Sequence, residues 1–188
     1  MTPWLADIYQ THRRGLYALA LSVLRRPELA EDAVHDAFVK ITRLKAQPDG
    51  DPVSYTFAAV RNAALDLRGK QAQIGASGIG AHADDIQAID LVAANTATNP
   101  AQQAMLGEDK ARVQAALARL SPDDREVILL RLWSNLSFQQ IGDACREPLG
   151  TIASRYYRAL AQLREALADG AQESSSPPAP SKESRHAH

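Results

Sequence analysis

The chain has 188 residues, of which 45% are hydrophobic and 5% aromatic, and its formal net charge is −1. This length allows one ordinary domain or two small ones, and the predominance of Ala, Leu, Val and Ile among apolar positions favours helices over sheets. The single Cys145 excludes an internal disulfide and a cysteine-based metal cluster, and no signal peptide or membrane-length apolar run is present. We therefore expect a cytoplasmic protein without metal or cofactor, whose charge argues against indiscriminate DNA binding.

The N-terminal part of the chain contains three stretches with helical periodicity. Thr2 to Leu24 places apolar residues at roughly helical intervals. Pro27 opens a second helix, which has a wide apolar stripe and a remaining face that is mostly acidic. Asp51 and Pro52 can cap and start a third helix that runs to about Arg68. Three such helices predict a compact bundle.

The rest of the chain divides into a linker, a second helical region and a tail. Glycines and polar residues dominate from Gly69 to Asn99, which indicates a flexible linker at a domain boundary. Asn99-Pro100 and Ser121-Pro122 are signals that each start a helix, and the chain after Asp169-Gly170 has the composition of a disordered tail. We predict an all-α protein with two small helical domains. They occupy residues 1–70 and 99–169, joined by a flexible linker at 71–98 and followed by a disordered tail at 170–188.

A helix-turn-helix is predicted within the C-terminal domain. Ser137 to Cys145 is a short helix candidate in which Ser137 and Gln140 form a capping box, and a second helix starts near Pro148. Because Arg can read guanine edges or clamp phosphates, the polar side of the second helix predicts DNA recognition; the alternative is an ordinary amphipathic helix with a solvated face. The apolar side comprises Ile152, Tyr156, Leu160, Leu163 and Leu167, and the polar side comprises Thr151, Ser154, Arg155, Arg158 and Gln162.

Four stretches, in this order along the chain, together resemble one protein family. Ala30 to Phe38 resembles the Ala-Glu-Asp-x-x-Gln-x-x-Phe motif of bacterial extracytoplasmic-function sigma factors, of the sigma-70 superfamily. Tyr55 to Arg68 is similar to their next motif, in which Arg-Asn-x-x-x-Asp-x-x-Arg is prominent. Leu117 to Arg131, with Leu-Ser-Pro-x-x-Arg-Glu-Val, resembles the start of their C-terminal domain, and Leu136 to Arg155 resembles their helix-turn-helix. The matches cover most of residues 1–168.

The resemblance implies a sigma factor, a non-catalytic subunit that binds core RNA polymerase and directs promoter-specific transcription initiation. Its N-terminal domain would dock on the polymerase clamp and engage the minus-ten element. Its C-terminal domain would bind the minus-thirty-five element and contact the polymerase flap, and an anti-sigma factor or another regulator is a further implied partner. By motif position, the polymerase-binding residues would be Glu31, Asp32, His35 and Asp36; the minus-ten residues Tyr55, Arg61, Asn62 and Arg68; and the minus-thirty-five residues Gly150, Thr151, Ser154, Arg155 and Arg158.

Several positions depart from the family pattern. His35 stands where Gln is usual, and Tyr55-Thr56 replaces a common Trp-Leu pair. Gly142 replaces an Ala inside the first helix of the helix-turn-helix, which costs up to ~1 kcal/mol of helix propensity. Arg146 occupies a turn position where Gly is usual, so we expect strain there, and Ala153 replaces a Lys that would contact a phosphate.

These departures leave alternatives open. One is a sigma-like regulator or adaptor that binds polymerase or another protein and recognises DNA weakly. A standalone helix-turn-helix repressor is another, but it gives the acidic N-terminal helix no purpose. An enzyme has the least support, because His35-Asp36 is a lone acid–base pair and the sequence shows no phosphate loop, nucleophile elbow or metal-ligand spacing.

Overall fold

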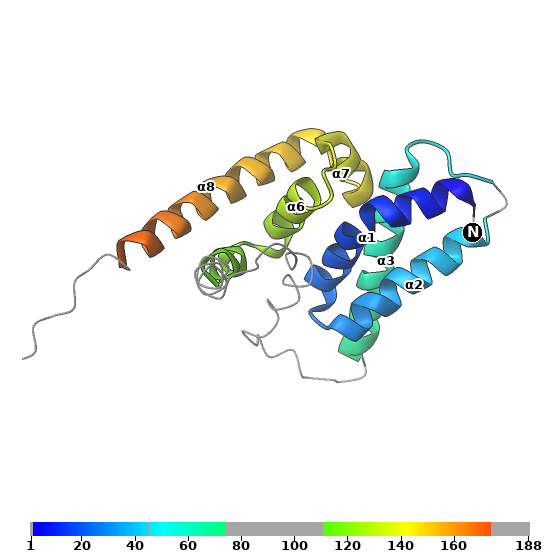
Figure 1. Cartoon of the computed structure of the whole chain (residues 1–188), viewed down its shortest axis with the longest axis horizontal. Coiled ribbons are helices and arrows are strands. Elements are labelled where there is room, and N and C mark those ends of the chain that lie inside the picture. Colours follow the sequence, from blue (N-terminus) through cyan, green and yellow to red (C-terminus); the bar gives the residue numbers. More distant parts are fainter. Residues whose placement is uncertain (1, 45, 74–110, 174–188) are drawn as a thin grey trace, which may run out of the picture.

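The computed structural model describes residues 2–44, 46–73 and 111–173, and every secondary-structure element within these ranges is a helix (Figure 1). The N-terminal half consists of α1 (Pro3–Leu24), α2 (Pro27–Thr42) and α3 (Pro52–Gln73). In the C-terminal half, residues 111–119 are helical and are followed by α6 (Pro122–Leu132), α7 (Phe138–Cys145) and α8 (Leu149–Glu173). The all-α prediction is confirmed. None of the described helices is both long and apolar enough to cross a membrane.

The helices start where the sequence predicted, but two of them continue further. α3 runs past Arg68 to Gln73, and α8 runs to Glu173, so residues 170–173 are helical and do not belong to a disordered tail. The physical reason is that one Gly costs only about 1 kcal/mol in a helix, and good helix formers follow both Gly69 and Gly170. The predicted linker from 74 onward, the helix start at Asn99-Pro100 and the tail from 174 lie outside the described residues.

Polar caps explain two of the helix starts. At α3, Asp51 Oδ2 accepts hydrogen bonds from the Ser54 backbone N–H at 3.0 Å and from Ser54 Oγ at 2.6 Å. At α6, Ser121 Oγ accepts a hydrogen bond from the Asp124 N–H at 3.2 Å. Each cap satisfies a backbone donor that the first helical turn leaves without a partner.

The N-terminal helices pack on one another through the apolar stripes that the sequence predicted. Small side chains on α2 (Ala30, Ala33 and Ala37) are buried and let this helix approach α1 and α3 closely. Phe57 of α3 is fully buried, as expected for a core position. Phe38 is half-buried, and its ring meets Tyr9 edge-on at 5.2 Å.

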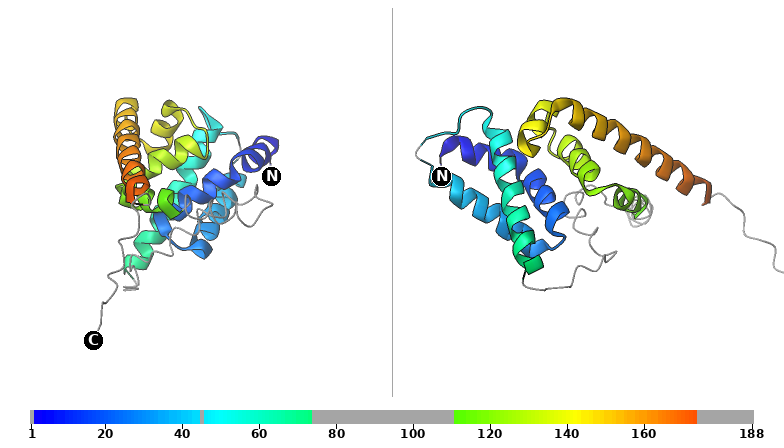
Figure 2. Two further views of the ribbon diagram at one scale, coloured as in Figure 1. Left: turned by 60° about the vertical axis from the view of Figure 1, so that its left-hand side comes forward. Right: turned by 180° about the vertical axis from the view of Figure 1, so that it is seen from behind.

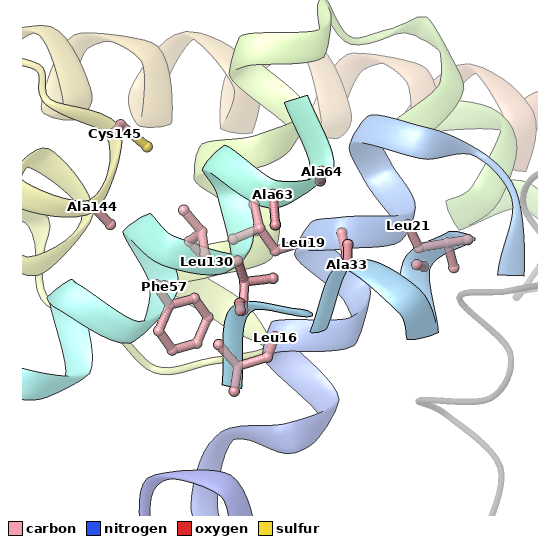
Figure 3. Packing of buried hydrophobic residues seen from close by; sticks show 14 of the residues in the cluster. Leu16, Leu19, Leu21, Ala33, Phe57, Ala63, Ala64, Leu130, Ala144 and Cys145 are labelled. Carbon is pink, nitrogen blue, oxygen red and sulfur yellow. The ribbon is translucent and has the colours of Figure 1, made fainter. Parts of the chain in front are cut away.

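The two halves also pack against each other. α7 lies against α3, and α6 lies between α8 and α1 (Figures 1 and 2). One hydrophobic cluster therefore crosses from half to half, and Figure 3 shows it from close by, with Leu130 of α6 near Phe57 of α3. The N-terminal half contributes Leu16, Leu19, Phe57, Val60 and Ala64, among others, and the C-terminal half contributes Val127, Leu130, Leu136, Ile141, Ala144 and Cys145.

A second, smaller cluster stabilises the C-terminal half alone. It lies between the helical residues 111–119, α6 and α8, and its buried members are Ala116, Leu117, Leu120, Ile128, Ala159 and Leu163. The C-terminal half thus has apolar contacts of its own in addition to those it shares with the N-terminal half.

Candidate DNA and polymerase interfaces

The predicted helix-turn-helix is formed by α7 and α8. Ser137 Oγ accepts a hydrogen bond from the Gln140 N–H at 3.1 Å, and Gln140 Oε1 accepts one from the Ser137 N–H at 2.9 Å, which confirms the capping box. α8 begins at Leu149, directly after Pro148, whose carbonyl accepts from the N–H groups of Thr151 and Ile152. Pro148 therefore directly precedes the first residue of α8, in agreement with the predicted helix start near this proline.

The turn between α7 and α8 depends on two unusual positions. Arg146 has φ 59°, in the left-handed region, as predicted from the absence of Gly there. Gly142 has a role that the sequence analysis missed, because a Cβ atom at this position would lie 2.8 Å from the carbonyl oxygen of Glu147. The glycine therefore lets the turn fold back closely over α7, which explains why a residue with low helix propensity is tolerated inside this helix.

The start of α8 carries a depression of about 470 Å³. All five residues predicted to bind the minus-thirty-five element line it: Gly150, Thr151, Ser154, Arg155 and Arg158. Asp123, from the first turn of α6, also lines it and was missed by the sequence analysis. The fold therefore brings two hydroxyl and two guanidinium groups together on one surface, next to the Asp123 carboxylate, and Ser154 Oγ donates to the Gly150 carbonyl at 2.8 Å.

Arg158 is held by a buried carboxylate. Its Nε donates to Asp124 Oδ2 at 3.0 Å and its Nη2 to Asp124 Oδ1 at 2.5 Å. The Asp124 side chain is 3% exposed, whereas that of Arg158 is 55% exposed. Burial alone would raise the pKa of Asp124, but hydrogen bonds from Arg158 and Ser121 outweigh it and lower that pKa; the same bond to Asp124 raises the pKa of Arg158. The Nε edge of this guanidinium is therefore engaged inside the protein.

Arg155 contacts two acidic residues, neither of which is fully buried. Its Nη1 donates to Glu147 Oε1 at 2.9 Å, and its Nη2 lies 3.4 Å from Asp123 Oδ2. Both carboxylates are accessible to solvent, and Asp123 is exposed. The side chains of Arg155 and Glu147 are 19% and 27% exposed, so this pair is partly buried, whereas the longer contact to the exposed Asp123 is solvated and weak.

The predicted minus-ten residues do not all share one surface. Tyr55, Asn62 and Arg68 are exposed on α3. Arg61 instead forms a two-point ion pair with Glu126 of α6, with Nε–Oε1 at 2.6 Å and Nη2–Oε2 at 3.2 Å. The two side chains are 21% and 9% exposed, and the bond to Glu126 raises the pKa of Arg61. In this conformation Arg61 connects the two halves and, unlike the other three, is largely withdrawn from solvent.

Glu126 could have been noticed in the sequence by its context. It directly precedes the apolar run Val127 to Leu130, which is buried. A charged side chain next to such a run is buried only when it has an oppositely charged partner. Its partner lies 65 positions away, so no local pattern identifies it.

Other contacts support the same junction between halves. Gln140 of α7 donates to Asp51 Oδ2 at 3.0 Å. Partial burial would raise the pKa of Asp51, but hydrogen bonds from Ser54 and Gln140 lower it overall. Gly15 of α1 meets the turn after α6 so closely that an added Cβ would lie 2.8 Å from Ser134 Cβ and would overlap its Oγ. That buried Oγ finds no hydrogen-bond partner among the described residues.

The predicted polymerase-binding residues occupy the outer face of α2. Glu31, Asp32, His35 and Asp36 are all exposed, while the apolar residues of the same helix face the bundle. The structure thus places three carboxylates and an imidazole together on one solvent-facing helix surface.

Comparison with known proteins agrees with this architecture. Residues 8–74 match the family model of sigma-70 region 2, and residues 110–163 match that of sigma-70, region 4. The chain is 28% identical over 166 residues to the ECF RNA polymerase sigma factor SigE of Mycolicibacterium smegmatis, covering 86% of this chain and 61% of that protein. It is 26% identical over 172 residues to the ECF RNA polymerase sigma factor SigK of Mycolicibacterium vanbaalenii, covering 86% of this chain and 81% of that protein.

A solved structure is also similar. The sigma factor RpoE of Bartonella quintana, determined in complex with the anti-sigma factor NepR, superposes with a TM-score of 0.59 at 27% identity, covering 86% of this chain and 97% of that chain. The two family models match the two helical halves in the order that the sequence motifs predicted. The chain belongs to the sigma-70 family, and within it to the extracytoplasmic-function (ECF) sigma factors.

Proposed function

We propose that this chain binds core RNA polymerase in the cytoplasm and directs promoter-specific transcription initiation. The outer face of α2 binds the polymerase clamp, the exposed side of α3 engages the minus-ten element, and the start of α8 reads the minus-thirty-five element while the C-terminal half contacts the flap. The observation that carries the proposal is the depression on α8, where two guanidinium groups and two hydroxyl groups converge.

The acidic face of α2 fits a protein partner. Glu31, Asp32 and Asp36 would repel a phosphate backbone, but they complement a basic surface on polymerase. His35 lies among them and adds a hydrogen-bonding group to the same contact.

The two arginines of α8 have different roles in this proposal. Arg158 keeps its Nε edge on the buried Asp124, because leaving would strand an uncompensated carboxylate in the interior. Only its outer Nη atoms can reach DNA, which suits a phosphate contact. Neither carboxylate that Arg155 contacts is fully buried, so Arg155 can exchange them for a base and present a full guanidinium fork to a guanine.

On α3, Tyr55, Asn62 and Arg68 are the residues proposed to hold a melted minus-ten strand. The exposed Tyr55 ring can stack on a base, which is worth about 1–3 kcal/mol per base, and the polar side chains can hydrogen-bond to it. Phe57 has no such role, because it is fully buried.

A regulator is a further proposed partner. The similar sigma factor RpoE was solved with an anti-sigma factor, and we extend that class of partner to this chain. A sigma-like adaptor with weak DNA recognition is the second candidate function, and the engagement of Arg61 by Glu126 is the observation that favours it.

A gel-shift assay on promoter fragments tests the proposal. Fragments selected from genomic DNA are incubated with the chain alone, with core polymerase alone and with both. A sequence-specific shift that requires both proteins is the expected result. A specific shift by the chain alone would instead indicate a standalone repressor, and polymerase binding without any specific shift would indicate the adaptor.

A further inference from the structure

Two acidic side chains flank the arginine that is proposed to read a guanine of the minus-thirty-five element. Arg155 Nη1 donates to Glu147 Oε1 at 2.9 Å, and Arg155 Nη2 lies 3.4 Å from Asp123 Oδ2. Glu147 comes from the turn between α7 and α8, and Asp123 comes from the first turn of α6. The guanidinium therefore has a carboxylate near each of its two terminal nitrogens, so one positive charge faces two negative charges.

The backbone of Glu147 is fixed by the turn in which it lies. Its N–H donates to the Gly142 carbonyl at 2.9 Å, and its own carbonyl oxygen packs against Gly142 so closely that a Cβ there would lie 2.8 Å from it. Pro148 follows, and a residue before proline is restricted to extended backbone conformations. Glu147 thus offers its carboxylate to Arg155 from a defined position.

Asp123 is placed differently, because it lies near both arginines of α8 and is exposed. Its side chain is 60% exposed, whereas that of Glu147 is 27% exposed. The hydrogen bond to Asp124 raises the pKa of Arg158, and the charge of Asp123 adds to that effect. The contact between Asp123 and Arg155 is longer and more solvated than the Glu147 contact, so it is the weaker of the two.

The charge of the incoming DNA group decides how readily Arg155 exchanges these carboxylates for it. A phosphate is negative, so Glu147 and Asp123 repel it as it approaches the guanidinium. The O6 and N7 atoms of a guanine are uncharged acceptors whose geometry matches two N–H groups of an arginine, and they meet much less repulsion. The two carboxylates therefore lower the affinity of Arg155 for the phosphate backbone more than its affinity for a guanine.

We propose that Glu147, assisted by Asp123, determines the specificity of the minus-thirty-five contact by keeping Arg155 from phosphates and so favouring a guanine. This inference rests on the proposed reading of the minus-thirty-five element by α8. Glu147 is a positioning residue that acts through Arg155 and makes no DNA contact of its own in this proposal. Asp123 makes the smaller contribution, because its contact with Arg155 is longer and exposed.

Glu147→Gln tests this role, because the amide keeps the size of the side chain and removes its charge. Fluorescence anisotropy measures binding of the holoenzyme, formed from core polymerase and the full-length chain, to fragments with a preferred or a scrambled minus-thirty-five sequence. The ratio of the two affinities should fall about tenfold, mainly through tighter binding to the scrambled fragment. On that fragment, the slope of log affinity against log salt concentration should steepen by about one, since Arg155 then neutralises a phosphate.

A second variant tests the same charge effect without altering the turn. Asp123→Asn changes an exposed side chain of α6 and should lower the ratio of affinities in the same direction, by a smaller factor than Glu147→Gln does. An unchanged ratio in Asp123→Asn would exclude Asp123 from the proposal. Urea unfolding establishes the stability of each variant separately, because a merely structural role of Glu147 would lower stability without changing the ratio.

Two controls show whether the effect passes through Arg155. Asp143→Asn removes one negative charge from the same helix-turn-helix, at an exposed carboxylate that accepts a hydrogen bond from Gln139 of the same helix. It should change both affinities by a similar factor and leave their ratio at the wild-type value. Glu147→Gln made in an Arg155→Ala background should likewise leave the ratio of that background unchanged.

The outcomes distinguish this inference from the proposed function. Equal affinities of the wild-type holoenzyme for the two fragments would remove the minus-thirty-five role of α8, and the inference with it. A clear wild-type preference that Glu147→Gln leaves unchanged would overturn the inference and retain the proposed function. The same loss of preference with and without Arg155 would also overturn the inference, since Glu147 would then act on DNA independently of that arginine.

Discussion

Arg158 of α8 and Asp124 of α6 meet through two hydrogen bonds although they lie 34 positions apart in the chain. Because the carboxylate is buried and the guanidinium is largely exposed, Arg158 is held in one orientation at the rim of the α8 depression. This relationship gives the two arginines of α8 separately testable roles.

Arg158→Ala, made together with Asp124→Asn so that no unpaired carboxylate is left buried, should weaken holoenzyme binding by a similar factor on every promoter fragment compared with Asp124→Asn alone. A lost phosphate contact also lowers the slope of log affinity against log salt concentration by about one. Fluorescence anisotropy on several fragments at several salt concentrations measures both effects. Arg164→Ala, which alters an exposed residue further along α8, serves as the control. A change in sequence preference for Arg158→Ala would contradict the phosphate assignment.

Arg155→Ala should instead relax sequence preference. The loss of binding free energy should be about 1–3 kcal/mol on the preferred minus-thirty-five sequence. It should be small on a fragment in which the base pair read by Arg155 is replaced. Selection of promoter variants by the wild-type and variant holoenzymes measures the difference. Equal losses of affinity on all fragments would show that Arg155, like Arg158, contacts only the phosphate backbone of the DNA.

Gly142→Ala should destabilise the chain. Alanine gains up to about 1 kcal/mol of helix propensity, but its Cβ would lie 2.8 Å from the Glu147 carbonyl, and such overpacking costs about 1–3 kcal/mol. Urea unfolding should therefore show a lower midpoint than the wild type. Gly69→Ala is the matched control, since the space around that helical glycine is open and alanine should be neutral or stabilising there. A stabilised Gly142→Ala variant would show that the turn relaxes freely.

Gly15→Ala and Ser134→Gly should compensate for each other. The first adds a Cβ that overlaps the Ser134 side chain, and the second removes that side chain. Gly15→Ala alone should lower the free energy of unfolding by about 1–3 kcal/mol, and the double variant should recover most of the loss. Thermal unfolding of the four chains completes the cycle. Additive effects would mean that the two residues do not touch in solution.

Acid should weaken the fold through Asp124. The pKa of this carboxyl is lower in the folded chain than its unfolded value of about 3.9, so its stabilising contribution is complete above that value and is lost as pH falls through the folded pKa. The wild type should therefore lose stability below about pH 4 more steeply than Asp124→Asn does. Asp143→Asn, at an exposed site, should follow the wild-type curve. Urea titrations at several pH values measure the free energy of unfolding. If its dependence on pH were the same for the wild type and Asp124→Asn, Asp124 would not have this role.

Local chemistry predicted much of this structure. Ser137 and Gln140 identified a capping box and Pro27 identified a helix start, because each signal depends on neighbours within a few positions. The strain expected at Arg146, which has positive φ, came instead from the family pattern, in which Gly is usual there. The helical spacing of apolar residues in α3 likewise agrees with the burial of Phe57.

Contacts between distant residues could not be predicted in this way. Asp124 follows the predicted helix start at Ser121-Pro122, but its partner Arg158 belongs to another helix, 34 positions away. The pairing of Glu126 with Arg61 depends on how the two helical halves pack against each other, and the spacing of apolar residues within each helix does not indicate this. Gly142 was interpreted by helix propensity alone, whereas its role depends on the path of the following turn.

Run-off transcription with core RNA polymerase tests the central claim most directly. Core enzyme with the wild-type chain should produce discrete transcripts from a subset of genomic fragments that core enzyme alone does not transcribe, and Arg155→Ala should reduce them on those fragments while Arg164→Ala should not. Identical transcripts with and without the chain, or failure of the chain to bind core polymerase, would contradict its assignment as the promoter-recognising subunit.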